Sequence, residues 1–228
     1  MSAAGDVAAA LTALLSVGCS LAQPDADGDT PLDIAAYSDN APVVRALLAL
    51  GVAATTTSLA LAVEHPGIVR LLLAADPPVG ELVTVRVGAV TTTPLMQAAW
   101  TAELESVQLL LGAGVSVLRR NERGWTALMY SLRSKSADAA AVLSVLAALL
   151  AAGADVDKRD LAGNTALHVL ADKSHAKPWA APAARLVLGS GADASITNKA
   201  GRMPAQTVPK AARGGELHRL LLEAAAGA

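Results

Sequence analysis

Paired apolar residues followed by two further residues and a glycine recur along this chain. The stretches are LLSVG, LLALG, LLGAG, LLAAG and VLGSG, which end at Gly18, Gly51, Gly114, Gly153 and Gly191. Around each pair, apolar residues return at helical spacing, as at Val44, Leu47 and Leu48. This spacing predicts helices with one apolar face, and a glycine suits the helix end because it adopts a left-handed backbone without strain.

A second element, built around a threonine, precedes the last four of these helices. Thr30 and Thr93 stand before Pro-Leu, and Thr126 and Thr165 stand before Ala-Leu. A threonine hydroxyl caps the free amides of a helix start, and proline fits the first helical position because its missing N–H has no partner there. Met203, before Pro-Ala, stands at the same place in the last unit. With it included, the glycine and the following element are 12 residues apart four times, and the element and the next apolar pair are 17 residues apart three times. With the four residues from pair to glycine, the period is 33 residues.

Each unit therefore consists of two antiparallel helices and a loop. One such hairpin cannot bury its apolar face alone, so the units must stack into a solenoid. The segments DADGDTPLDIAA, NERGWTALMYSL, DLAGNTALHVLA and NKAGRMPAQTV resemble the first part of the ankyrin repeat, and PVVRALLALG and SVQLLLGAG resemble its second helix. The resemblance runs from about residue 3 to 226 and implies an all-α ankyrin-repeat solenoid with inter-repeat loops.

On this pattern the chain is a single domain, residues 1–228. We expect an N-terminal capping helix at about 3–24 and a C-terminal cap at 198–228. The repeats between them are expected at about 25–56, 57–80, 90–120, 121–159 and 160–197.

The repeats depart from the family pattern at several places. Only His168 keeps the family's Leu-His pair. Whether the other repeats form the hydrogen bonds that this histidine makes in the family does not follow from the sequence. The second repeat, which starts at TSLALAV, lacks most of its loop. Its alignment with the other repeats can be shifted by two residues. Insertions at 134–138 and 173–182 are polar or rich in proline, so we expect them on the surface.

The segment LLSVGCS, residues 14–20, allows two interpretations. An apolar run before a small residue and Cys19 resembles a lipoprotein signal, whereas Leu14, Leu15 and Gly18 lie in register with every later second helix. A signal peptide also begins with basic residues, and MSAAGD contains Asp6 and no lysine or arginine. We therefore expect a folded N-terminal cap.

Composition narrows the class of protein. Apolar residues make up 53% of the chain, and the formal net charge is −2. The apolar stretch at 139–154 is shorter than the roughly 20 residues a bilayer requires, and the low net charge argues against general nucleic-acid binding. A single cysteine forms no internal disulfide. We expect a soluble monomer of the cytoplasm or the nucleus that binds neither membranes nor nucleic acid.

No residue pattern indicates catalysis. His168 belongs to the repeat motif, and the other histidines are scattered: His65, His175 and His218. The aspartates at 25, 27 and 29 alternate as in a calcium loop, but an alanine stands where that loop needs a glutamate. Cys19 suits a packed thiol better than a nucleophile. We therefore expect no enzyme, no metal and no cofactor.

Aromatic residues provide the candidate site, because the chain has only five. The family resemblance places Tyr37, Trp100 and Arg133 at the end of the first helix, on the concave face used for binding, with Trp125 on the adjoining loop. We include Arg123 and Asp172 in this candidate partner-binding site. Tyr130 is expected in the core and Trp179 in an insertion. Packing of neighbouring apolar surface is the alternative role for each ring.

The two halves of the chain carry opposite charge. Residues 1–100 have three arginines against nine acids, whereas residues 101–228 have 15 basic residues against 11 acids. Basic residues gather in two neighbouring loops, which are either solvated tips or a stripe for an acidic partner: Arg119, Arg120, Arg123, Lys158 and Arg159. An aromatic centre between the two halves suits a ligand with apolar anchors and charges of both signs.

These features favour a non-catalytic protein-binding module that acts as an adaptor, scaffold or inhibitor. An assembly chaperone or a structural subunit of a larger complex is the alternative, since partners would then cover the abundant apolar surface. An enzyme is the third hypothesis. The partner is expected to be another protein, and its identity does not follow from the fold.

Overall fold

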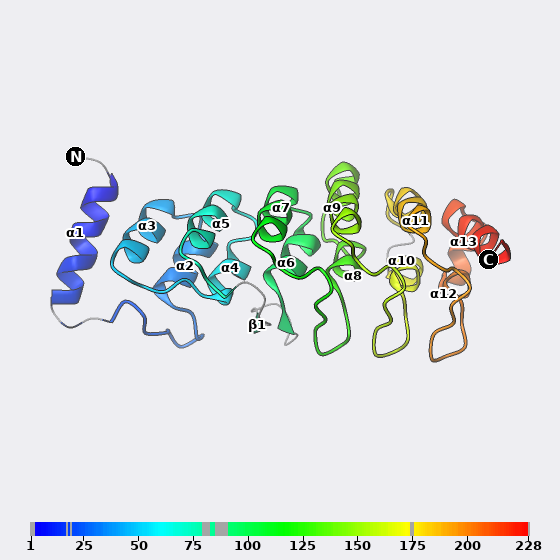
Figure 1. The fold of residues 1–228 in the computed structure, drawn as a ribbon, viewed down its shortest axis with the longest axis horizontal. Coiled ribbons are helices and arrows are strands. Elements are labelled where there is room, and N and C mark those ends of the chain that lie inside the picture. Colours follow the sequence, from blue (N-terminus) through cyan, green and yellow to red (C-terminus); the bar gives the residue numbers. More distant parts are fainter. Residues whose placement is uncertain are drawn as a thin grey trace.

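The computed structural model describes residues 3–16, 18, 20–78, 83–84, 91–173 and 176–227, and its helices form two rows (Figure 1). The inner row, on the side of the inter-repeat loops, contains α2 (Pro31–Tyr37), α4 (Thr56–Leu61), α6 (Pro94–Thr101), α8 (Ala127–Ser131), α10 (Ala166–Lys173) and α12 (Pro204–Thr207). The outer row contains α1 (Ala3–Ser16), α3 (Ala41–Ala49), α5 (Pro66–Leu73), α7 (Leu104–Gly112), α9 (Ala139–Ala151), α11 (Ala180–Gly189) and α13 (Glu216–Ala226). A short 3-10 helix, Lys210–Ala212, precedes α13.

Helices of each row pack against the next member of that row, so the rows run the length of the molecule. The helix α1 packs against α3 at the start of the outer row, and Figure 1 shows it lying across the end of the stack at an angle to the other outer helices. Between α5 and α6, β1 (Val83–Thr84) pairs antiparallel with β2 (Thr91–Thr92). The expected all-α solenoid of stacked helical hairpins is confirmed.

Aliphatic side chains at repeated positions fill the space between the rows. The leucine two residues after each capping threonine is at most 1% exposed: Leu32, Leu95, Leu128 and Leu167. The first residue of the apolar pair on the outer helices is 0% exposed: Leu47, Leu110, Leu149 and Val187. Burial of these side chains is the main favourable term for stacking, because each repeat covers the apolar face of its neighbour.

The inner helices begin as their sequence predicts. The hydroxyl oxygens of Thr30, Thr93 and Thr126 accept the amide N–H three residues later, at 3.2, 3.2 and 3.4 Å. In the second repeat, Thr55 caps α4, so the helix starts earlier than the TSLALAV motif indicates. Thr55, two residues before Thr57, is therefore the residue of this repeat that corresponds to the capping threonines of the others.

The five glycines that were expected to end helices all have left-handed backbones, with φ between +81° and +90°. At the end of α3, the N–H of Gly51 donates to the carbonyl of Leu48, and the N–H of Val52 donates to Leu47, both at 3.0 Å. These bonds satisfy carbonyls that the helix leaves unpaired.

The two insertions are not entirely surface segments, which contradicts the expectation from their composition. Trp179 is fully buried, and Ser134 is 2% exposed with its hydroxyl donating to the carbonyl of Trp100 at 2.8 Å. One large ring buries more surface than the polar average of a segment suggests. Residues 174 and 175 of the second insertion, including His175, lie outside the described residues, as does Cys19.

The loops before α8, α10 and α12 are joined to each other by backbone hydrogen bonds. The N–H of Leu161 donates to the carbonyl of Arg123 at 3.0 Å, and the N–H of Lys199 donates to Ala162 at 2.9 Å. The side chain of Arg120 donates to the carbonyl of Arg159 at 2.8 Å, and Arg159 donates in turn to that of Thr197. Arg120 and Arg159 therefore tie neighbouring loops together through their guanidinium groups.

We expect Gly163→Ala to destabilise the protein by about 1–2 kcal/mol. Gly163 has φ +80°, and a Cβ atom there would lie 2.8 Å from the backbone nitrogen of Lys199 in the next loop. Urea unfolding measures the change. The control is Gly67→Ala in α5, where a Cβ meets nothing within 4 Å and stability should not fall. A Gly163→Ala protein as stable as the parent would contradict close loop stacking.

His168 links α10 to the next repeat. The N–H of Thr165 lies 3.2 Å from Nδ1 of His168, and Nε2 lies 2.8 Å from the carbonyl oxygen of Arg202. Because a backbone amide only donates, Nδ1 accepts and the proton sits on Nε2, which donates to Arg202. The stitching role that the sequence gives to His168 is confirmed.

The contribution of His168 to stability should fall as the pH drops from 7.5 to 5. Burial lowers the pKa of His168 below its ordinary value of about 6.5. The unfolded chain therefore takes up the proton first, and the free energy of unfolding decreases as the pH falls through the unfolded pKa towards the lower folded one. Urea unfolding at both pH values should show a smaller fall for His168→Gln than for the parent. If the free energy of unfolding fell equally in the parent and in His168→Gln, protonation of His168 would not be the cause.

Candidate functional site

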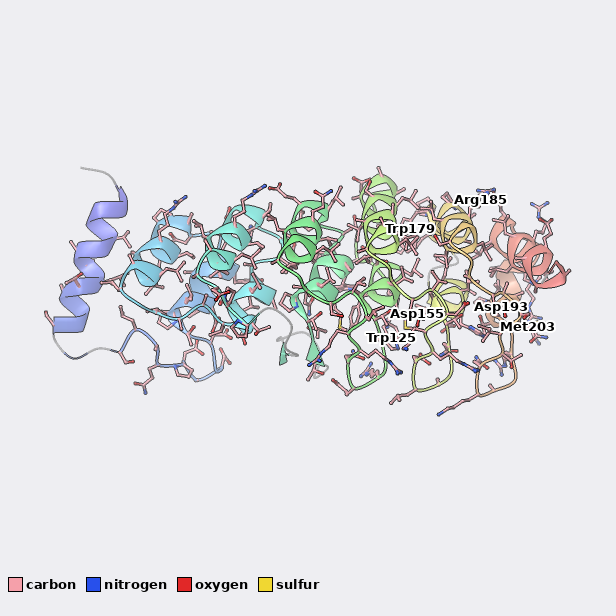
Figure 2. All side chains as sticks on the ribbon, in the orientation of Figure 1. Trp125, Asp155, Trp179, Arg185, Asp193 and Met203 are labelled. Carbon is pink, nitrogen blue, oxygen red and sulfur yellow. The ribbon has the colours of Figure 1, made fainter. Side chains whose placement is uncertain are left out.

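Four of the sequence-predicted site residues occupy the same place in their repeats. Each stands seven residues after its capping threonine, at the end of an inner helix or just beyond it: Tyr37, Trp100, Arg133 and Asp172. Trp125 and Arg123 lie in the loop before α8. Figure 2 shows Trp125 on the loop side of the inner row, whereas Trp179 lies among the helices near α11. We call the surface made by the inner helices and their loops the inner face.

The first cavity of the inner face lies between α2, α4 and α6 and has a volume of about 260 Å³. Tyr37 and Trp100 both line it, so the structure brings together two residues that are 63 positions apart. Tyr37 is 67% exposed, while Trp100 is half-buried. Three acids also line the cavity, namely Asp29, Asp33 and Glu64. This end of the inner face combines apolar walls with negative charge.

The second cavity, of about 140 Å³, lies between Trp100 and Trp125. Arg123, Arg133 and Tyr130 line it as well. The guanidinium of Arg133 lies 5.0 Å from the ring centre of Trp125, within the range of a cation–π contact. Trp125 also meets Tyr130 edge to face, with 5.6 Å between ring centres. Two arginines line this cavity, whereas three acids line the first. The acidic first half and the basic second half of the sequence therefore both contribute to the inner face.

Tyr130 is half-buried and lines this cavity, so its expected place in the core is only partly right. Its hydroxyl accepts a hydrogen bond from the side-chain amide of Asn121 at 3.0 Å. Burial raises the pKa of Tyr130 above its ordinary value, with the hydrogen bond from Asn121 acting in the opposite direction. Tyr130 therefore stays a neutral, ordered ring at neutral pH.

A third cavity, of about 210 Å³, continues the row on the other side of Trp125. Asp172 lines it together with His168, Asp160 and Arg202, so its walls are polar. Trp100 belongs to the first and second cavities, and Trp125 belongs to the second and third. The six candidate residues are thus distributed along one continuous row of cavities separated by two tryptophan rings.

Trp100 is held in place by residues that the sequence did not identify. The amide of Lys135 donates to the carbonyl of Trp100 at 3.0 Å, and the Nζ atom of Lys135 lies 5.3 Å from the centre of its ring. The same Nζ atom is 2.7 Å from the Oε1 atom of Glu64. The first insertion therefore anchors the ring from the fourth repeat, and nothing in its composition indicates this.

The described ranges contain no group of three or more side chains suited to hold a metal ion. In the part of the chain that the structure covers, every helix is too short or too polar to cross a membrane.

Two family models match adjoining parts of the chain. The model of three ankyrin repeats matches residues 59–147, and the single ankyrin repeat model matches residues 27–58. Together they cover more than half of the sequence. The chain belongs to the ankyrin-repeat family. Ankyrin repeats are generally non-catalytic protein–protein interaction modules.

Solved structures agree with this assignment. The ankyrin repeat domain of Bcl-3, described as a unique member of the IkappaB protein family, superposes with a TM-score of 0.70 and 25% identity, covering 96% of this ankyrin-repeat chain and 93% of that one. The human ASB11 ankyrin repeat domain gives a TM-score of 0.72 at 20% identity, covering 98% of this chain and 97% of that one. No curated protein sequence matches this chain.

Proposed function

We propose that this ankyrin-repeat protein is an adaptor, scaffold or inhibitor that binds an extended segment of a partner protein along its inner face. The observation that carries the proposal is the row of three cavities separated by Trp100 and Trp125. Concave pockets bounded by aromatic rings are where interface binding energy concentrates. A segment lying across the row would place successive side chains in successive cavities.

Charge supports the same proposal. The first cavity is lined by acids and the second by Arg123 and Arg133, so the face is complementary to a segment with basic and acidic residues in a fixed order. Complementary charges contribute orientation and rate of association, while the rings contribute affinity.

Photo-crosslinking at matched positions tests the proposal. Benzoylphenylalanine replaces Tyr37 on the inner face in one protein and Arg45 on the outer helix α3 in another; both sites are exposed. After irradiation in cells, mass spectrometry should find a covalent partner on the Tyr37 protein and none of that partner on the Arg45 protein. Equal labelling from both sites, or labelling from the Arg45 protein alone, would overturn binding at the inner face.

A further inference from the structure

The first cavity of the inner face contains a buried acid with a spare oxygen. Asp33 is 3% exposed, and its Oδ2 atom accepts hydrogen bonds from the amide and the hydroxyl of Thr30, at 2.9 and 2.7 Å. Its Oδ1 atom is buried and accepts no hydrogen bond from any described residue. Later repeats carry Met96, Met129 or His168 at the same place, so capping the helix does not require an acid. A buried acceptor without a donor costs free energy. Almost none of the Oδ1 surface is open to solvent, so a ligand donates to it only after the carboxylate turns toward the cavity.

The size and walls of this cavity suit one long side chain. Its volume of about 260 Å³ lies below the range of about 300–1,000 Å³ that is usual for whole small molecules. Ile34 and Leu61 supply aliphatic walls, and Tyr37 and Trp100 supply rings. Ile34 is 48% exposed, so a partner reaches this wall from solvent. Among the described residues, no lysine or arginine lines the cavity.

The protein's own Lys135 shows the chemistry that this surface accepts. Its ammonium group lies between the ring of Trp100 and the carboxylate of Glu64 at the edge of the cavity. Glu64 therefore already has a cation, whereas the Oδ1 atom of Asp33 has none. An acidic side chain would be repelled by these carboxylates, and an apolar one would leave Asp33 unpaired.

We infer that this cavity binds a lysine or arginine side chain of the partner protein, with the cationic head at the carboxylate of Asp33 and the methylene stem between Tyr37, Ile34 and Trp100. The inference rests on the proposed binding of a partner segment along the inner face. It specifies which type of partner side chain binds at the amino-terminal end of that face.

Capped pentapeptides that differ only in the central residue test the inference. The central residue is lysine, arginine, norleucine or glutamate, and binding is followed by the indole N–H signal of Trp100 in NMR titrations. The chain has three tryptophans, so few indole signals need assignment. We expect the lysine and arginine peptides to bind at least tenfold more tightly than the norleucine peptide, and the glutamate peptide to bind most weakly.

Two variants separate the role of Asp33 from that of folding. Asp33→Asn keeps an oxygen for the amide of Thr30 and should reduce the preference for lysine over norleucine to less than twofold. Ile34→Lys places a cation of the chain itself at the exposed mouth of the cavity and should weaken the lysine peptide at least tenfold. The matched control Ile34→Met keeps the wall and should bind as the parent does. Circular dichroism confirms that each variant is folded.

Three outcomes would overturn the inference. These are norleucine or glutamate peptides that bind as tightly as lysine, a Trp100 signal that no peptide moves, or an Asp33→Asn protein with the full preference for lysine. Each leaves the crosslinking result at Tyr37 unchanged, so failure of this inference is distinguishable from failure of the proposed function. Loss of crosslinking at Tyr37 together with a preserved lysine preference would show a pocket without the proposed partner.

Discussion

Trp179→Ala should lower the free energy of unfolding by about 3–5 kcal/mol, the range for removing a large buried ring. Trp179 is 0% exposed and belongs to the continuous core, next to the start of α11. Its removal takes apolar surface from the core and leaves a cavity between repeats. Urea unfolding followed by circular dichroism measures the loss, with the slope of the transition compared to detect separate unfolding of repeats.

Trp179→Phe is the matched control for this prediction. The indole N–H of Trp179 is buried and has no acceptor among the described residues, so phenylalanine removes an unpaired donor and keeps most of the ring. We expect it to cost less than half as much as alanine. If Trp179→Ala lowered the free energy of unfolding by no more than about 0.5 kcal/mol, as ordinary surface substitutions do, the second insertion would not anchor the core.

Trp100→Ala should weaken partner binding by about 2 kcal/mol, which corresponds to about a 30-fold higher Kd. The ring forms the wall shared by two cavities and makes a cation–π contact with Lys135, so its loss merges the cavities and removes that contact. Folding should change little, because the buried residues of α6, such as Leu95 and Ala99, remain. Calorimetric titration with the partner identified by crosslinking at Tyr37 measures the effect.

Trp125→Ala should have a similar effect, and Arg45→Ala on the outer row should bind like the parent. If both tryptophan variants bind normally while changes in the insertion at 173–182 abolish binding, the inner-face proposal fails and the insertion is the site. Circular dichroism of every variant keeps loss of folding apart from loss of binding.

The fold was predictable because its signals are local and repeated. Threonine caps and helix-ending glycines are read within one turn of the chain, and Thr30 and Gly51 act as their neighbours in sequence indicate. Trp179 was not predictable, because its burial depends on the packing of α11 against α9 and not on the polar segment around it. The same limit applies to Arg120, whose partner lies 39 residues away.

The candidate site was predictable in outline. The period of the repeat brings Tyr37 and Trp100 to one face, and the structure places both on a common cavity. The sequence showed Asp33 only as a departure from the family's histidine and gave no indication of its unpaired oxygen. Nor did it show Lys135, whose contact with Glu64 spans 71 residues. Contacts between insertions and distant repeats have no periodic signal.

The ties between loops make the two ends of the array mechanically unequal. The loops at 121–125, 160–164 and 198–202 form a continuous hydrogen-bonded edge, whereas the loop at 25–29 adjoins a repeat with only four positions from Gly51 to Thr55. In a repeat protein each repeat contacts only its neighbours, so the stiffness of each part depends on the interfaces between adjacent repeats. We therefore expect the loops of the carboxyl-terminal repeats to keep their spacing when a partner binds. An acidic residue of the partner near Arg133 would then be selected by its fit to a preformed surface.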